Sequence, residues 1–377
     1  SLTDRGAARL ELIDALTGAT HTIDAPRGAT LSSPAWSPDG SRIAYIANFD
    51  DATRLYVADV ASGKARQLGT AQLLATLVTA PRWTADGRNV VAVVIPEGRK
   101  APPVRPAIAT GPEVRITDGH KDKTRVYATL LQEPYDEALL EYYITGQLAL
   151  IDASSGAVHR VGQPAMIDDV DPSPDGKYFR VTVVDKPFYY IVPLASFARS
   201  QELWDATGRT VARLAEQPAR LTDDRDDVPA SERAAADTVA RDFVWLPDGS
   251  GLAYLKQDPA PNRPESDSSA ESGGAPRARG PRRKDHLYAW APPFDSASRK
   301  ELLASDNRIG SVLFSDDASM AFVAENANGT GHVYATYFNE PGKKFTIWRL
   351  RGLNAQVGPG LGGFFGVSGG RGGTGDD

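Results

Sequence analysis

Short apolar segments recur along this chain, and a polar turn precedes each of them. Five of these segments are rich in Ile, Val, Tyr and Ala and are apolar at both alternating positions: 42–47, 89–95, 178–184, 251–255 and 319–324. A strand that is apolar on both faces is covered on both sides by other sheets. The pattern therefore predicts buried β-strands in an all-β fold.

The turns between these segments repeat a common phrase that ends in Asp-Gly. Full copies end at Gly40, Gly87, Gly176 and Gly249, and a degraded copy covers 313–317. Proline presets the first turn position, Asp caps the turn and Gly accepts a positive φ, so each copy predicts a hairpin. Units of roughly 40 to 50 residues with about four short strands and tight turns are typical of propeller blades.

Counting these units gives about five and a half blades. Two strands fall in 1–25, and fuller units occupy 33–70, 80–163, 167–218, 240–304 and 309–350. A propeller closes only when its first and last blades meet, because an open end leaves unpaired faces and edges. We therefore expect a β-propeller of four-stranded blades that is cut at both ends.

The intervals between the units contain insertions. Residues 132–143 predict a short helix, with Pro134 in its first turn. Residues 258–284 are rich in Pro, Ser, Gly and Arg and predict a disordered loop. We expect a propeller domain over 1–352, followed by a Gly-rich flexible tail over 353–377.

Composition excludes several classes of function. The net charge of −6 argues against a nucleic-acid partner, and the absence of cysteine excludes disulfides and zinc–thiolate sites. No apolar run is long enough for a membrane span. The five histidines lie at no zinc-ligand spacing, so neither a metal nor another cofactor is expected.

Two motifs that could suggest chemistry have simpler interpretations. Gly366–Gly370 matches the G-x-S-x-G of serine hydrolases, but Ser368 lies in the glycine tail with no helix or histidine after it. No catalytic residue is therefore expected. The acidic cluster at 168–171 is interpreted as a solvated turn, since it lacks calcium-loop spacing.

One group of residues is a candidate substrate-binding or gating site. Arg125 and Tyr127 precede the predicted helix, while Lys186 and Tyr189 follow a predicted middle strand. Loops at blade ends face the mouth of a propeller, where function is usually located. Basic and aromatic side chains there suit an acidic peptide side chain or a terminal carboxylate. Packing between blades is the alternative interpretation of these four residues.

The turn repeats and three longer stretches resemble a known family, the prolyl oligopeptidase-type serine peptidases, and in particular their glutamyl endopeptidase-like branch. The stretches are 125–143, 171–193 and 203–215. The resemblance implies a seven-bladed N-terminal propeller that restricts access to a Ser-Asp-His triad in an α/β-hydrolase domain. Members of this branch usually have Arg where Lys186 stands, and Lys keeps the charge but loses the bidentate fork.

The resemblance implies a non-catalytic, substrate-gating propeller of a serine peptidase that cleaves after Glu or other acidic residues. Its partners would be a peptide substrate and its own C-terminal α/β-hydrolase domain, which these 377 residues lack. This chain alone is then expected to be inactive, and a homo-oligomer is left open. The alternative is a stand-alone TolB-like propeller that scaffolds protein partners. A metal-dependent lyase propeller is a third hypothesis, and the histidine spacing counts against it.

Overall fold

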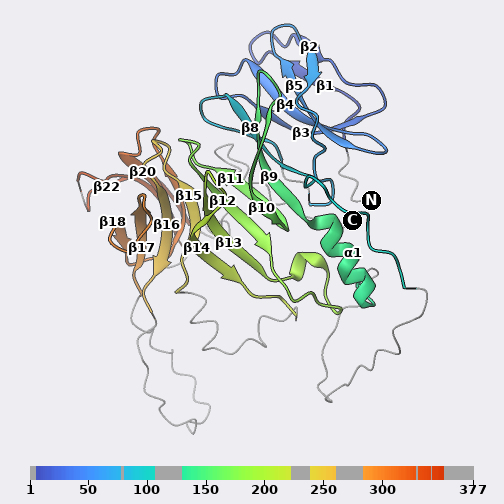
Figure 1. The fold of residues 1–377 in the computed structure, drawn as a ribbon. Coiled ribbons are helices and arrows are strands. Elements are labelled where there is room, and N and C mark those ends of the chain that lie inside the picture. The colour runs from blue at the N-terminus through green and yellow to red at the C-terminus, as the bar shows by residue number, and fades with distance from the viewer. Residues whose placement is uncertain are drawn as a thin grey trace. The chain divides into compact units, whose positions relative to one another are not determined.

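The computed structural model describes residues 6–77, 80–106, 130–221, 238–259, 283–327, 330–340 and 342–351. These residues are almost entirely β-strands and turns (Figure 1). The chain divides into two compact units, Ser1–Asp227 and Val228–Asp377. Within the described residues, no helix combines the length and the apolar character that crossing a bilayer requires.

The described part of the first unit consists of one two-stranded and three four-stranded antiparallel sheets. The two-stranded sheet pairs β1 (Leu10–Ile13) with β2 (Thr20–Ile23). The larger sheets comprise β3 (Thr30–Trp36), β4 (Arg42–Asn48), β5 (Thr53–Asp59) and β6 (Ala65–Gln67); β7 (Arg82–Trp83), β8 (Asn89–Val94), β9 (Gly146–Asp152) and β10 (Val158–Ala165); and β11 (Ile167–Pro172), β12 (Tyr178–Val184), β13 (Arg199–Asp205) and β14 (Thr210–Gln217). The helix α1 (Pro134–Ile144) lies between β8 and β9, and the 3₁₀ turn η1 (Leu194–Ser196) lies between β12 and β13.

The second unit contributes two further four-stranded antiparallel sheets among its described residues. They comprise β15 (Arg241–Trp245), β16 (Leu252–Gln257), β17 (Asp285–Trp290) and β18 (Arg299–Ser305); and β19 (Ile309–Phe314), β20 (Met320–Ala327), β21 (Thr330–Tyr337) and β22 (Lys344–Arg351). In all five large sheets the strands follow chain order, which is the meander of a propeller blade. The fold class predicted from the sequence, an all-β propeller of four-stranded blades with a short helical insertion, is confirmed.

The repeated turn phrase works as its sequence suggests. In the turn between β3 and β4, Asp39 Oδ1 accepts a hydrogen bond from Ser37 Oγ at 2.6 Å and one from the Ser41 N–H at 3.1 Å. These bonds, the one from the Ser37 hydroxyl foremost, lower the pKa of Asp39 to about 2. Gly40 takes a φ of 70°, a conformation that side chains with a Cβ disfavour. The degraded copy forms the same turn, with Ala318 at a φ of 52° in the glycine position.

The middle strands are covered on both faces, as their apolar pattern predicts. On β8, Val90 and Val94 are buried with β4 and β5, whereas Val91 and Val93 are buried with β11 and β12. All four side chains are at most 2% exposed. The stacking of one sheet on the next therefore builds a continuous core through the first unit.

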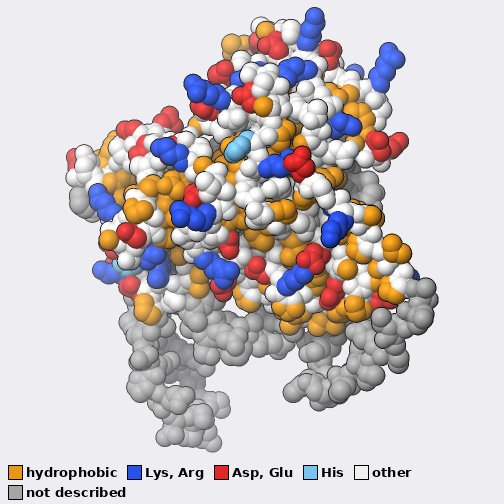
Figure 2. Space-filling model, viewed as in Figure 1, with side chains coloured by type: hydrophobic (Ala, Val, Ile, Leu, Met, Phe, Trp, Pro, Cys, Tyr) orange, Lys and Arg blue, Asp and Glu red, His pale blue; other side chains and the backbone are white. Residues whose placement is uncertain are grey.

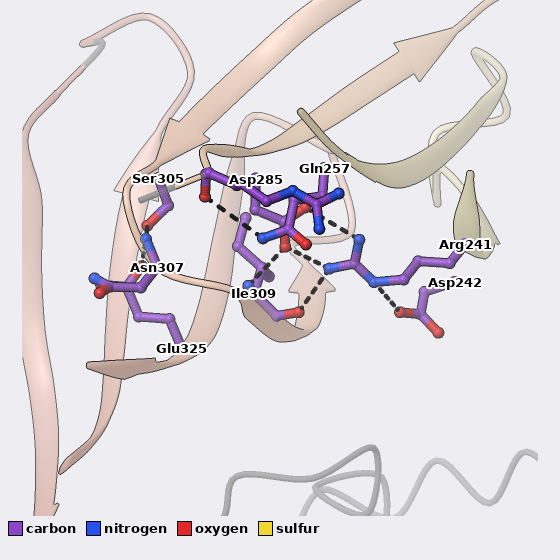
Figure 3. Close-up of polar contacts among 9 residues, drawn as sticks. Arg241, Asp242, Gln257, Asp285, Ser305, Asn307, Ile309 and Glu325 are labelled. Carbon is purple, nitrogen blue, oxygen red and sulfur yellow. Dashed lines mark hydrogen bonds and ion pairs between the residues drawn. The ribbon is translucent and has the colours of Figure 1, made fainter. Parts of the chain in front are cut away.

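In the second unit, buried polar side chains join the two sheets in addition to apolar packing. Both guanidinium NH₂ groups of Arg241 on β15 donate to Asp285 on β17, a fully buried carboxylate (Figure 3). Asp285 Oδ2 also accepts the backbone N–H of Ile309 on β19 at 2.8 Å. Glu325 on β20 accepts from Ser305 Oγ at 2.5 Å. These bonds fix the position of one sheet against the next.

The segments between the predicted blades differ in how well the sequence predicts them. The predicted helix at 132–143 corresponds to α1. The glycine tail and nearly all of the predicted disordered loop lie outside the described residues. The interpretation of 168–171 as a solvated turn is wrong, because these residues form most of strand β11 and three of their carboxylates pair with arginines. Two of those arginines, Arg82 and Arg199, are distant in sequence from their partners, so the local pattern could not reveal them.

Candidate functional site

Within the blades, the longest connections between strands occur at one repeated position. In a meander, the turn between the first and second strands and the connection between the second and third strands lie at opposite ends of the sheet. The turn between the first and second strands is tight in all five large sheets. The connection between the second and third strands spans 95–145, 185–198 and 258–284 in three of them. We call the end of each blade that carries the second-to-third connection its insertion end.

Local signals start and stop α1 within the first of these connections. Pro134 occupies the first turn, where its missing N–H costs nothing. Asp136 Oδ2 accepts the backbone N–H groups of Gln132 at 2.8 Å and Glu133 at 3.2 Å, which caps the helix start. Thr145 Oγ1 donates to the carbonyl of Glu141 at 2.7 Å and satisfies the last turn. The helix is therefore specified by its own sequence.

A single arginine organises the connection between β12 and β13. Arg199 Nε pairs with Asp168 Oδ2 at 2.7 Å, and its terminal nitrogens donate to the carbonyls of Phe197 at 2.9 Å and Leu194 at 3.3 Å. Its side chain is 14% exposed. Charge-assisted bonds of this kind hold the η1 turn in place at the end of the sheet.

The helix and this connection share a small aromatic and aliphatic core. Ile144, Phe188 and Phe197 are buried together, and Leu140 and Tyr189 pack against them. The rings of Phe188 and Phe197 stack at 5.5 Å, and Tyr189 meets Phe197 edge-on at 5.9 Å. The insertions of two adjacent blades are thereby joined. We refer to α1 together with residues 185–198 as the helix–loop cluster.

An open groove runs between α1 and η1 on the surface of this cluster. Its volume is about 520 Å³. Its walls are mostly apolar and include Leu130, Leu131, Leu139, Leu140, Tyr143, Val192, Pro193, Leu194 and Phe197. Arg105 and Asp136 supply charge at its sides, and Arg105 pairs with Glu133 at 2.8 Å. Hydrophobic side chains are visible on the surface over α1, with acidic and basic ones among them (Figure 2).

Two of the four predicted site residues belong to the helix–loop cluster. Lys186 Nζ pairs with Glu141 Oε2 on α1 at 2.7 Å, and both side chains are about half exposed. Tyr189 packs inward against Phe197, which lines the groove. Arg125 and Tyr127 lie outside the described residues. The structure thus brings Lys186 and Tyr189 together, and their role as site residues stays a prediction. Sequence reasoning did not identify Glu141, the ion-pair partner of Lys186.

Other contributors to the cluster carried no clear signal in the sequence. Arg199 and Arg105 are single arginines with no motif around them, and their partners lie far along the chain or on another element. The acidic run at 168–171 was the one visible hint, since a charged strand flanked by apolar ones requires partners.

The described residues of the cluster present a surface of apolar and charged groups. Across the parts of the chain that the structure describes, no group of three or more His, Asp or Glu side chains could hold a metal ion. The groove offers apolar contact, a capped helix and one arginine beside it. Among the described residues of the cluster, no nucleophilic side chain has a base beside it.

Comparison with known proteins gives sequence relatives in plants, although no family model matches the chain. The chain is 31% identical over 238 residues to the probable chloroplastic glutamyl endopeptidase of Oryza sativa subsp. japonica, covering 61% of this chain and 24% of the relative. It is 28% identical over 313 residues to the protein of the same description from Arabidopsis thaliana, covering 80% and 30% respectively. The chain thus spans about a quarter to a third of the length of these relatives.

Solved structures with similar folds share little sequence with the chain. A prolyl endopeptidase aligns over 93% of this chain and 42% of its own, with 15% identity and a TM-score of 0.46. TolB from Acinetobacter baumannii aligns over 88% and 57%, with 15% identity and a TM-score of 0.37. The chain is thus similar in sequence to part of two plant proteins named probable glutamyl endopeptidases, and its own described residues form the four-stranded blades of a propeller.

Proposed function

We propose that this chain is the non-catalytic, substrate-gating propeller of a serine peptidase that prefers to cleave after acidic residues. The α/β-hydrolase domain of the parent protein would supply the catalytic triad. The observation that carries the proposal is the helix–loop cluster, where two blades gather an apolar groove and an exposed lysine at their insertion ends. The plant relatives are named probable glutamyl endopeptidases, which supports the acidic preference.

The pairing of Lys186 with Glu141 suggests how an acidic peptide would be admitted. An exposed ion pair contributes only about 0–1 kcal/mol, because water and salt screen it. A peptide carboxylate can therefore replace Glu141 as the partner of Lys186 at low cost. Glu141 then competes with the peptide for Lys186, so that a neutral peptide gains no binding free energy at this position.

The test uses the full-length parent protein and peptides that differ only by Glu or Leu at the cleaved position. Lys186→Gln should lower kcat/KM for the Glu peptide about fivefold, which corresponds to roughly 1 kcal/mol, and leave the Leu peptide unchanged. Glu141→Gln should raise kcat/KM for the Glu peptide. A matched control is Lys177→Gln, which breaks an exposed pair with Asp175 in the tight turn of the same blade. Equal effects on both peptides would remove Lys186 from the site.

The gating part of the proposal has its own test. The parent should cleave short peptides and leave the same sequence uncut inside a folded protein. The 377-residue chain alone should not react with a fluorophosphonate probe. Labelling of Ser368 in this chain would contradict its non-catalytic role.

A scaffold function is the second candidate, because an apolar groove with charged sides also suits a segment of a partner protein. The two functions respond differently to Leu140→Asp in the groove. If the propeller gates a peptidase, the parent should lose peptide hydrolysis; if it is a stand-alone scaffold, the variant should lose binding of its partner protein.

A further inference from the structure

The two-stranded sheet β1–β2 has the features of the outer half of a propeller blade. Within the described residues β1 pairs only with β2, whereas each of the other sheets has four strands. In the β1–β2 turn, Asp14 is followed four residues later by Gly18 at a φ of 71°. The turns between third and fourth strands of two complete blades have the same spacing, with Gly63 and Gly156 four residues after their aspartates. Because the glycine follows its aspartate directly in the turns between first and second strands, β1 and β2 correspond to a third and a fourth strand.

The packing between neighbouring blades supports the same assignment. Gly208, in the third-to-fourth turn of the sheet β11–β14, lies so close to Gly162 on β10 that a Cβ on it would clash with the backbone. Strand β10 is the fourth strand of the preceding blade. Gly63, in the third-to-fourth turn of the sheet β3–β6, meets the backbone of Thr22 on β2 in the same way. Strand β2 thus takes the fourth-strand place in the blade that precedes β3–β6.

The outer edge of β1 is open to a further strand. The Asp14 N–H donates to the Ala19 carbonyl at 2.9 Å, and hydrogen-bonded pairs alternate along an antiparallel ladder. The N–H groups of Glu11 and Ile13 therefore point away from β2, where no described residue accepts them. An edge of this kind is a template for pairing with another strand.

Within the first unit, the equivalent place in the next blade is filled by a hairpin. Trp83 at the end of β7 donates from its indole Nε1 to the Ala35 carbonyl at 2.9 Å, and the Arg42 guanidinium lies 5.0 Å above its ring. Arg42 Nη2 also donates to the Gly87 carbonyl at 2.8 Å. Ala35 and Arg42 belong to β3 and β4, the first and second strands of the preceding blade. The hairpin of a first and a second strand is therefore what covers this tryptophan.

Trp36 stands at the same position of the turn phrase, at the end of β3, yet it is 55% exposed. It lies opposite Ile43, two positions before Tyr45, so it shares the face of the sheet on which Tyr45 is buried with β1 and β2. Among the described residues, no carbonyl accepts its indole N–H and no cation stacks on its ring. The outer strands β1 and β2 thus cover only part of this face.

We propose that a β-hairpin of the parent polypeptide, from outside residues 1–377, completes this blade as its first and second strands. The second strand of the hairpin pairs with the open edge of β1. The hairpin covers Trp36, accepts its indole N–H at a backbone carbonyl, and carries an arginine that stacks on the ring and donates to the Gly40 carbonyl, as Arg42 does in the next blade. The plant relatives have polypeptide to supply it, because the matched part is only 24% and 30% of their length.

Hydrogen exchange of the wild-type protein tests the pairing of β1. The amides of Glu11 and Ile13 should exchange at least about tenfold more slowly in the full-length parent than in the 377-residue chain. The amides of β5, which is paired on both edges in this chain, should exchange alike in the two proteins.

Urea denaturation of tryptophan variants tests the covering of Trp36. Trp36→Ala should lower the urea midpoint of the parent several times more than that of the 377-residue chain, because the ring is buried only in the parent. The matched control is Trp83→Ala, which should lower the midpoint of both proteins, since the hairpin that covers Trp83 is present in both. Circular dichroism of each variant checks that the sheets are intact.

Four results would overturn the proposal. Equal protection of Glu11 and Ile13 in the monomeric chain and in the parent would show that the chain covers this edge itself. Protection that appears in the chain only as it dimerises would assign the strand to a second copy. Fast exchange of both amides in the parent, or an equal cost of Trp36→Ala in the two proteins, would show that no hairpin of the parent binds here.

The inference rests on the proposed function only in taking these residues as part of a longer polypeptide. Because peptide hydrolysis is not measured, a failure of the parent to select acidic peptides leaves the exchange and denaturation results unaffected. Failure of the exchange test would likewise leave the helix–loop cluster and its proposed role unchanged.

Discussion

The buried pair of Arg241 and Asp285 is the point in the second unit where a single change should cost the most stability. Asp285 is fully buried and accepts from both NH₂ groups of Arg241 and from the Ile309 N–H. Arg241 Nη2 also donates to the Ile309 carbonyl at 3.1 Å. Removing one partner of such a pair leaves a buried charge without its counter-ion, which costs about 3–5 kcal/mol.

Two substitutions of Asp285 separate the cost of losing the ion pair from the cost of losing the Ile309 hydrogen bond. Asp285→Asn keeps an acceptor for the Ile309 N–H, and Arg241 keeps a second carboxylate, Asp242, at 3.5 Å. We therefore expect Asp285→Asn to cost about 3 kcal/mol, at the lower end of that range. Asp285→Ala also leaves the Ile309 N–H unsatisfied and should cost 1 kcal/mol or more beyond that, at about 4–5 kcal/mol in total.

Urea denaturation of the chain, together with hydrogen exchange at the Ile309 amide, measures these effects. Exchange of that amide should accelerate far more in Asp285→Ala than in Asp285→Asn. The control is Glu340→Gln, which breaks an exposed pair with Lys343 and should cost less than about 1 kcal/mol. If Asp285→Asn is no more costly than Glu340→Gln, the reasoning about the buried pair is wrong.

Two further predictions concern the repeated turns. Ala318→Gly should stabilise the chain by about 1 kcal/mol because it relieves a side chain at a φ of 52°, while Gly40→Ala should destabilise it, both measured as urea midpoints. Because Ser37 and Ser41 depress the pKa of Asp39 to about 2, the stability that this carboxylate contributes is present above pH 4 and lost as pH falls towards 2. Asp39→Asn should therefore flatten the fall of the urea midpoint between pH 4 and 2, and an unchanged slope would contradict this cause.

The blades could be predicted from the sequence because their signals are local. Each turn needs Asp and Gly within a few residues, and each middle strand shows its two buried faces in its own composition. The helix–loop cluster could be predicted only in part. Lys186 and Tyr189 stand in an unusual local sequence, but the Glu141 and Arg199 contacts depend on how distant segments meet. The groove has no local signal, since its leucines look like ordinary core residues.

The turns also explain why the helix–loop cluster lies at the insertion ends of its two blades. The tight turns are clamped by aspartates: Asp39 holds one between first and second strands, and Asp59 and Asp152 hold turns between third and fourth strands. Extra residues there would break several hydrogen bonds at once. The second-to-third connections lack this aspartate motif in their sequence, and their lengths differ widely, with four residues at 49–52 and the long segment 95–145. New binding groups can therefore be added at that end without disturbing the blade. It follows that substitutions at the insertion ends should alter ligand selection with little loss of stability. Substitutions of the turn aspartates should instead lower stability with little effect on ligand selection.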